Sequence, residues 1–253
     1  DMGFIPDVKR IIRKCTPKDE RQTLLFSATF NQDVLNLASM WTRNAEFVEI
    51  EPEQKTAERV EQTVYLVSDD DKLPVLVNYL KRPEVDKAIV FANRRDQCRD
   101  LEEDLRNQGV KVSLMSGEIA QNKRLKTLDQ FKKGQIQVLV ATDVAARGLH
   151  IPDVTHVFNF DLPQDAPDYV HRIGRTARLG AKGEAISFAC EDYAFHLPEI
   201  EQFIGYSIRT VSAGPDLIPQ ITIPPPPKRD RQHRHSGKRG AARRHNKGHG
   251  GRR

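Results

Sequence analysis

Short apolar runs alternate with amphipathic stretches through the middle of the chain. The runs are rich in Val and Ile, have the length of buried strands, and lie at 87–92, 111–115, 136–141, 154–160 and 184–190. Apolar residues spaced three and four apart predict helices over 96–108 and 121–133, with Gly109 and Gly134 as stop signals. This alternation predicts an α/β fold, in which helices cover both faces of a parallel sheet and ligands bind at the carboxyl ends of its strands.

The chain before this unit has a different character. Apolar runs at 23–30 and 47–50 predict two further strands. Residues 51–59 are polar and lack apolar periodicity, as an interdomain linker does. We therefore expect residues 1–50 to be the end of a first domain that lies mostly upstream, and residues 60–213 to form a second domain.

Charge is divided unevenly along the sequence. Residues 228–253 hold eleven of the 40 Lys and Arg residues but one of the 35 Asp and Glu residues, so a mildly acidic body carries a strongly basic tail. Four prolines precede this tail, and it contains no aliphatic side chain larger than that of alanine. We expect residues 214–253 to be disordered. The Arg and Gly content favours an arm that binds nucleic acid over the alternative, a solubilising tail.

Composition excludes several other classes of protein. The three cysteines are odd in number and far apart, which argues against a disulfide framework or a metal site and favours a reducing compartment. No apolar run of about 18 residues occurs, and the N-terminus lacks the pattern of a signal peptide. We expect a cytoplasmic protein without membrane contact.

A cluster of cationic side chains occupies residues 168–178. If this segment is helical, one face is apolar and the opposite face is basic. The basic side chains on that face are His171, Arg175 and Arg178. If Gly174 ends the helix early, the two arginines lie on the loop that follows. Guanidinium groups bind phosphate or carboxylate, and the alternative is a solvated face with Asp165 and Asp168 as local partners.

Five short motifs follow one another in a fixed order. They are SAT at 27–29, VFANR at 90–94, QNKR at 121–124, ATDVAARGLHIP at 141–152 and HRIGRTAR at 171–178. In this order they resemble the later motifs of the DEAD-box ATP-dependent RNA helicases, and the resemblance extends from residue 1 to about residue 210. It implies that the second domain is a RecA-like helicase C-terminal domain.

The resemblance implies residues that act on ATP. Arg175 and Arg178 resemble arginines that reach the γ-phosphate of ATP bound by the first domain, where their charge stabilises the transition state. His171 and Arg172 resemble a pair that contacts the first domain's catalytic carboxylates. Gly148 would border the nucleotide. Many members carry Asp in place of His150, where it accepts a hydrogen bond from the ribose; a neutral imidazole accepts one as well, and a protonated imidazole does not.

Other residues follow from the same resemblance. Ser27 and Thr29 would couple the ATP site to RNA, or cap a helix, or both. Asp143 and Arg147 would take part in interdomain coupling by orienting the loop that follows the strand at 136–141. RNA would be gripped through its sugar-phosphate backbone. The implied RNA-binding residues are Asn93, Arg94, Gly117, Gln121, Arg124 and Thr142.

The sequence contains neither a GxxxxGK[ST] phosphate loop nor a DEAD tetrapeptide. ATP and Mg²⁺ would therefore be bound mainly by the first domain, and we expect that this chain alone does not hydrolyse ATP. The resemblance implies the C-terminal half of a helicase that unwinds short RNA duplexes. Similarity to bacterial members active in RNA degradation implies RNase E and the RNA degradosome as partners. The alternative is a non-catalytic RNA-binding or scaffold module.

Overall fold

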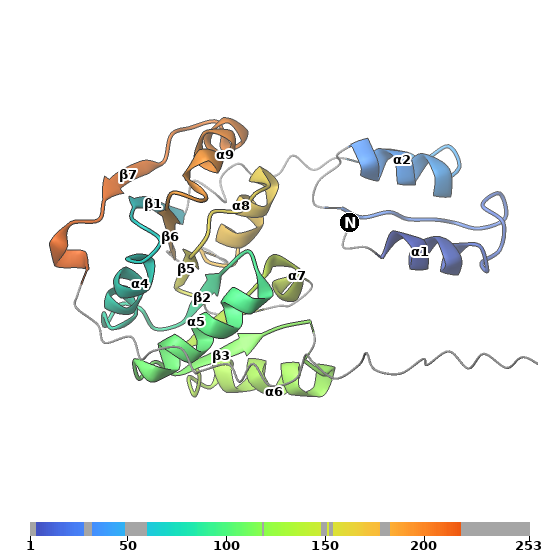
Figure 1. The fold of residues 1–253 in the computed structure, drawn as a ribbon. Coiled ribbons are helices and arrows are strands. Elements are labelled where there is room, and N and C mark those ends of the chain that lie inside the picture. Colours follow the sequence, from blue (N-terminus) through green and yellow to red (C-terminus); the bar gives the residue numbers. More distant parts are fainter. Residues whose placement is uncertain are drawn as a thin grey trace, which may run out of the picture. The chain divides into compact units, whose positions relative to one another are not determined.

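The computed structural model describes residues 4–27, 32–48, 60–117, 119–147, 151, 154–177 and 183–218. Within these ranges one sheet has seven strands, shown with its helices in Figure 1. The strands are β1 (Val60–Leu66), β2 (Ala88–Phe91), β3 (Val112–Met115), β4 (Val138–Ala141), β5 (His156–Asn159), β6 (Gly183–Ala189) and β7 (Arg209–Ser212). The helices of the same body are α4 (Lys72–Leu80), α5 (Arg95–Asn107), α6 (Gln121–Lys132), α7 (Asp143–Ala146), α8 (Ala166–Ile173) and α9 (Leu197–Ile204), with short 3-10 turns at Ala194–His196 and Pro215–Leu217.

The strands lie in the order β3-β4-β2-β5-β6-β1-β7, and every pairing is parallel. Helices α4 and α5 supply Leu76, Leu101 and Leu105 to the apolar core on one face of the sheet. Helices α6 and α8 supply Phe131 and Tyr169 to the core on the other face. The predicted α/β fold, a parallel sheet with helices on both faces, is confirmed.

The five predicted strands all form, and the two predicted helices are observed as Arg95–Asn107 and Gln121–Lys132. Gly109 and Gly134 follow these helices with φ of 81° and 69°, a left-handed conformation that glycine adopts without steric cost. In this body, strands β1 and β7 and helices α4, α7 and α9 were not predicted. Strand β1 is hidden by the polar run from Glu61 to Thr63, and β7 forms at the sheet edge by pairing with β1 although Val211 is its one apolar residue. Nearly every residue of helix α4 is buried, so its sequence lacks the polar face of an amphipathic helix.

The prediction of strands at 23–30 and 47–50 is wrong where the structure describes these residues. Helices α1 (Ile5–Ile12) and α2 (Gln32–Trp41) form in this part of the chain, but residues 23–27 and 47–48 are neither helix nor strand. Phe26 is 88% exposed and Leu24 is 68% exposed. A strand forms only when its backbone pairs with a neighbouring strand, and none of the seven described strands pairs with these runs.

Helix α8 ends at Gly174, so Arg175 lies on the loop that follows, as one of the two alternatives for this segment predicts. The loop is bonded to the segment that precedes β5, because the Thr176 hydroxyl donates to the carbonyl oxygens of Val154 and Thr155 at 2.6 and 3.0 Å. Ala177 has φ of 55°, a left-handed conformation that residues other than glycine seldom adopt. The loop therefore has little freedom to move away from α8.

The Gly183→Ala substitution tests this close packing. A Cβ atom at Gly183 would lie 2.2 Å from Thr176 Oγ1 and 2.6 Å from the Ala177 backbone nitrogen. We expect the free energy of unfolding to fall by about 1 to 3 kcal/mol, since the loop or the strand must shift. Urea denaturation followed by circular dichroism measures this change.

The matched control is Gly214→Ala, because a Cβ atom there meets nothing within 4 Å. We expect that variant to stay within about 0.5 kcal/mol of the wild type. Equal stability of the two variants would contradict the close packing of Gly183 against the loop.

Candidate functional site

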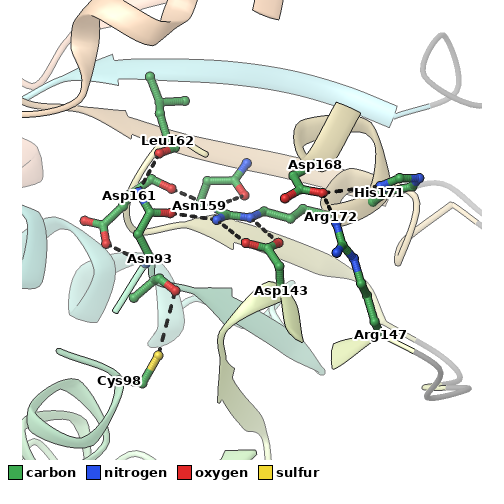
Figure 2. Close-up of polar contacts among 11 residues, drawn as sticks. Asn93, Cys98, Asp143, Arg147, Asn159, Asp161, Leu162, Asp168, His171 and Arg172 are labelled. Carbon is green, nitrogen blue, oxygen red and sulfur yellow. Dashed lines mark hydrogen bonds and ion pairs between the residues drawn. The ribbon is translucent and has the colours of Figure 1, made fainter. Parts of the chain in front are cut away.

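Polar residues follow three neighbouring strands of the sheet. Asn93 follows β2, Asp143 follows β4, and Asp161 follows β5. Strands β4, β2 and β5 are neighbours, and the carboxyl ends of parallel strands meet at one edge of a sheet. Figure 2 shows that these three residues converge on the side chain of Arg172, which enters from α8.

Arg172 is 1% exposed, and its guanidinium group uses every donor that it has. Nε and Nη2 each donate to one carboxylate oxygen of Asp143 at 2.7 Å. Nη2 also donates to the side-chain oxygen of Asn93 at 2.7 Å. Nη1 donates to the Asp161 carbonyl oxygen at 2.7 Å and to the Asn159 side-chain oxygen at 3.5 Å. Since a guanidinium group has five N–H donors, these bonds leave none for another domain.

A second group of charges lies on the outer side of α8. Asp168 pairs with Arg147 and lies 3.5 Å from the Nδ1 atom of His171. The neighbouring His171 and then the Arg147 guanidinium hold the pKa of Asp168 below its ordinary value, although burial acts in the opposite direction. Asp168 is therefore a local partner of the basic segment, as the alternative reading of that segment proposes. Asp143 and Arg147 each contact α8, one through Arg172 and the other through Asp168.

His171 and Arg175 differ from Arg172 in their surroundings. The His171 side chain is 34% exposed, and Arg175 is half-buried at the end of α8. The Arg175 backbone nitrogen donates to the Arg172 carbonyl oxygen at 3.0 Å, which ties its position to the buried arginine. These two side chains are the part of the basic segment that the structure leaves open to solvent within 166–177.

The structure does not test the roles predicted for five site residues. Ser27 is half-buried in the segment 4–27. Thr29, Gly148, His150 and Arg178 lie outside the described residues. Their predicted roles stay predictions, as do the limits of the domains.

The predicted RNA-binding residues follow three adjacent strands, β3, β4 and β2, at the same carboxyl edge. Gly117 is exposed, and a Cβ atom there would meet nothing within 4 Å. Exposed Gln121 begins α6, and Nη2 of Arg124 on that helix donates to the Ala145 carbonyl oxygen of α7 at 3.0 Å. Thr142 is the N-cap residue of α7. The sheet order thus gathers residues that the sequence separates.

Asn93 and Arg94 both follow β2, but the Arg94 side chain faces solvent and the Asn93 side chain faces the interior of the domain. Arg94 is exposed and pairs with Asp96 at 3.1 Å. The Asn93 side chain is bonded inward, since its Nδ2 atom donates to the Leu162 carbonyl oxygen at 2.9 Å and its oxygen accepts from Arg172. Asn93 therefore links the turn after β2 to α8 rather than presenting its amide to solvent.

Sequence reasoning missed Asp161 and Lys72, which form a buried ion pair at 2.8 Å. Asp161 comes directly after the predicted strand 154–160, and a polar residue in that place was the available signal. Lys72 has no such signal, because it begins a helix that was not predicted.

Thiol and metal chemistry receive no support from the described residues. Burial raises the pKa of the Cys98 thiol to about 12, so it stays protonated at neutral pH and its role is packing. In the part of the chain that the structure describes, no group of His, Cys, Asp and Glu side chains is placed to hold a metal ion. Among the described helices, none is long and apolar enough to cross a membrane.

Comparison with known proteins agrees with this arrangement. Residues 71–180 match the model of the helicase conserved C-terminal domain. The chain is 38% identical to the E. coli DEAD-box protein SrmB, whose crystal structure was solved with the regulator RraA bound. The two structures align with a TM-score of 0.59, over 66% of this chain and 97% of the SrmB chain. The chain belongs to the DEAD-box family of ATP-dependent RNA helicases and carries its C-terminal helicase domain.

Within this family the chain is similar to RhlB. It is 49% identical to the ATP-dependent RNA helicase RhlB of Cronobacter sakazakii over 90% of its own length and 54% of the relative's. It therefore spans about half the length of the curated relatives that it matches. The structure of Saccharomyces cerevisiae Dbp5 with RNA and ADP BeF3 is 31% identical, with a TM-score of 0.73 over 84% of this chain and 56% of that one.

Proposed function

We propose that this chain acts as the C-terminal half of an ATP-dependent RNA helicase that separates short RNA duplexes. The observation that carries the proposal is that the carboxyl edge of the sheet, where the residue set proposed for RNA lies, is hydrogen-bonded through Arg172 to helix α8. Residues after β2, β3 and β4 form the set proposed for RNA, and the end of α8 carries the set proposed for ATP. Bound RNA and bound nucleotide would then act on two parts of one domain that the hydrogen bonds of Arg172 connect.

On the nucleotide side, the donors that this chain offers fit the phosphate end of ATP. His171 lies on the outer part of α8 and Arg175 on the loop that follows, and Arg178 would add a second guanidinium. With Mg²⁺, ATP supplies the phosphoryl group whose transfer drives the cycle, and both would be held mainly by the first domain. The arginines would stabilise the charge that develops on the γ-phosphate. Arg172 would position them, because it is bonded entirely within its own domain.

On the RNA side, backbone amides and short side chains would hold the sugar-phosphate backbone of one strand. The open space at Gly117 lets a phosphate approach the main chain, and Arg94 and Gln121 are exposed beside it in sheet order. The basic residues of 228–253 would add affinity that depends on salt. A cytoplasmic role in RNA degradation, with RNase E and the degradosome as partners, is part of the same proposal and rests on the resemblance to bacterial members of the family.

The experiment compares this chain alone with a protein in which a DEAD-box ATP-binding domain precedes it. We expect the joined protein to release phosphate from ATP when single-stranded RNA is added, and the chain alone to release none, since its sequence has no phosphate loop. Phosphate release at saturating ATP, with and without RNA, is the measurement. RNA binding by both proteins without RNA-stimulated turnover in the joined one would instead favour a non-catalytic RNA-binding module.

A further inference from the structure

Lys72 is a charged side chain that the proposed function does not use, although it lies beside the site. It begins α4 and is completely buried. Its Nζ atom donates to Asp161 Oδ1 at 2.8 Å, pairs with Asp69 Oδ1 at 2.7 Å, and lies 4.5 Å from the centre of the Phe160 ring. Burial by itself lowers the pKa of Lys72, but Asp161 and Asp69 together raise it above its ordinary value. The ammonium group therefore stays charged inside the domain.

Asp161 connects this charge to the rest of the edge. It is completely buried, and its Oδ1 atom also accepts from Gln97 Nε2 at 3.2 Å. Its Oδ2 atom accepts from the Asn93 backbone nitrogen at 2.9 Å, and its carbonyl oxygen accepts from Arg172 at 2.7 Å. One aspartate thus contacts the buried lysine, the turn after β2, and helix α8.

A buried ion pair is a poor device for stability alone. Removing two charges from water costs several kcal/mol each, and apolar residues of similar volume often serve as well or better. The Lys72–Asp161 pair does not lie in the middle of the sheet, where apolar residues form the two cores. It lies at the carboxyl edge, where ligands of parallel sheets bind. This location indicates that the ion pair holds neighbouring side chains in place and does not mainly stabilise the fold.

We propose that Lys72 and Asp161 are positioning residues that couple the RNA side of this domain to its nucleotide side. Asp161 holds Asn93, which is adjacent to exposed Arg94, and the same residue holds Arg172, whose carbonyl oxygen accepts from Arg175. Lys72 fixes the orientation of the Asp161 carboxylate, since it occupies the oxygen that does not face Asn93. Displacement of the turn after β2 by RNA would then move α8 and its arginines. This inference rests on the proposed function.

The closing experiment uses Asp161→Asn and Asp69→Asn in the joined protein that responds to RNA. Each substitution removes one of the two carboxylates beside the same ammonium group, at 2.8 and 2.7 Å. An amide has one acceptor oxygen, so the asparagine that replaces Asp161 cannot accept from both Lys72 and Asn93. The Asp69 side chain is 59% exposed and does not contact Asn93 or Arg172 in the hydrogen bonds described above. Asp69→Asn is thus the matched control.

For Asp161→Asn we expect kcat of RNA-stimulated turnover to fall by about tenfold or more and the half-saturating RNA concentration to rise by about fivefold. For Asp69→Asn both values stay within about twofold. Melting temperatures are measured first, and turnover is assayed well below them. Partial unfolding would lower kcat by removing active molecules but would leave the half-saturating RNA concentration unchanged, so a change in both values separates positioning from stability.

Wild-type values of both constants in folded Asp161→Asn protein would overturn the proposal, as would equal losses in the two variants. If Asp161→Asn does not fold, the apolar replacement Lys72→Met with Asp161→Leu takes its place, because it removes both buried charges and leaves only the exposed Asp69 carboxylate without its partner. The same two constants decide the outcome. Failure of the proposed function is distinct, since it appears as an absence of RNA-stimulated turnover in the joined wild-type protein.

Discussion

The Arg175→Ala variant of the joined protein is expected to turn over ATP at least about a hundredfold more slowly than the wild type in the presence of RNA, with little change in RNA affinity. In the proposed function, the Arg175 guanidinium group stabilises the charge that develops on the transferred phosphoryl group. The backbone of Arg175 is held at the end of α8, because its nitrogen donates to the Arg172 carbonyl oxygen. Alanine keeps the loop and removes the charge. Steady-state phosphate release and RNA titration measure the two quantities.

The control for this substitution is Arg106→Ala. Arg106 is an exposed arginine near the end of α5, and its partner is Glu102 on the same helix. Helix α5 begins at the carboxyl edge of the sheet and runs away from it, so we expect turnover within about twofold of the wild type. Near-normal turnover in Arg175→Ala would refute its assignment to the γ-phosphate.

The Arg172→Met variant should show the opposite pattern, in which stability is lost first. Methionine fills much of the same volume but leaves the Asp143 carboxylate, the Asn93 side chain and the Asp161 carbonyl oxygen without their donor. Breaking a buried pair from one side typically costs about 3 to 5 kcal/mol, and we expect the free energy of unfolding of this chain to fall by about that amount. Urea denaturation followed by circular dichroism gives the value.

Arg147→Met is the matched comparison, because Arg147, the C-cap residue of α7, contacts the same helix α8 through Asp168. The Arg147 side chain is 32% exposed and its partner is Asp168, so solvent screens the pair and we expect a loss of about 1 kcal/mol or less. If Arg172→Met unfolds at the same urea concentration as the wild type, the buried network does not hold α8 in the way that its hydrogen bonds indicate.

The candidate site was predictable where a motif falls directly after a predicted strand. Asn93, Thr142 and Asp143 all stand in that position, and the rule that ligands bind at the carboxyl ends of parallel strands brings them together before any coordinates are known. Lys72 was not predictable in this way. Its helix follows β1, a strand whose polar residues hide it, and its partner Asp161 is 89 positions away along the chain.

The basic segment at 168–178 shows a second limit of sequence reasoning. Helical periodicity correctly separates its apolar side, since Tyr169 and Ile173 are buried. It also places Arg175 on the opposite, basic face, but it does not indicate that Arg172 is buried. The difference comes from acceptors on other strands, which surround Arg172 and saturate its donors.

The sequence by itself determined the alternation of strands and helices, the class of fold and the family. Each of these depends on local spacing or on motifs that are contiguous in the chain. Only the tertiary structure decided which arginine is buried, which apolar runs become strands, and which side chains connect the two parts of the site. Those outcomes depend on partners supplied by distant segments: a strand needs a neighbouring backbone, and a buried charge needs an acceptor that the order of the sheet brings beside it.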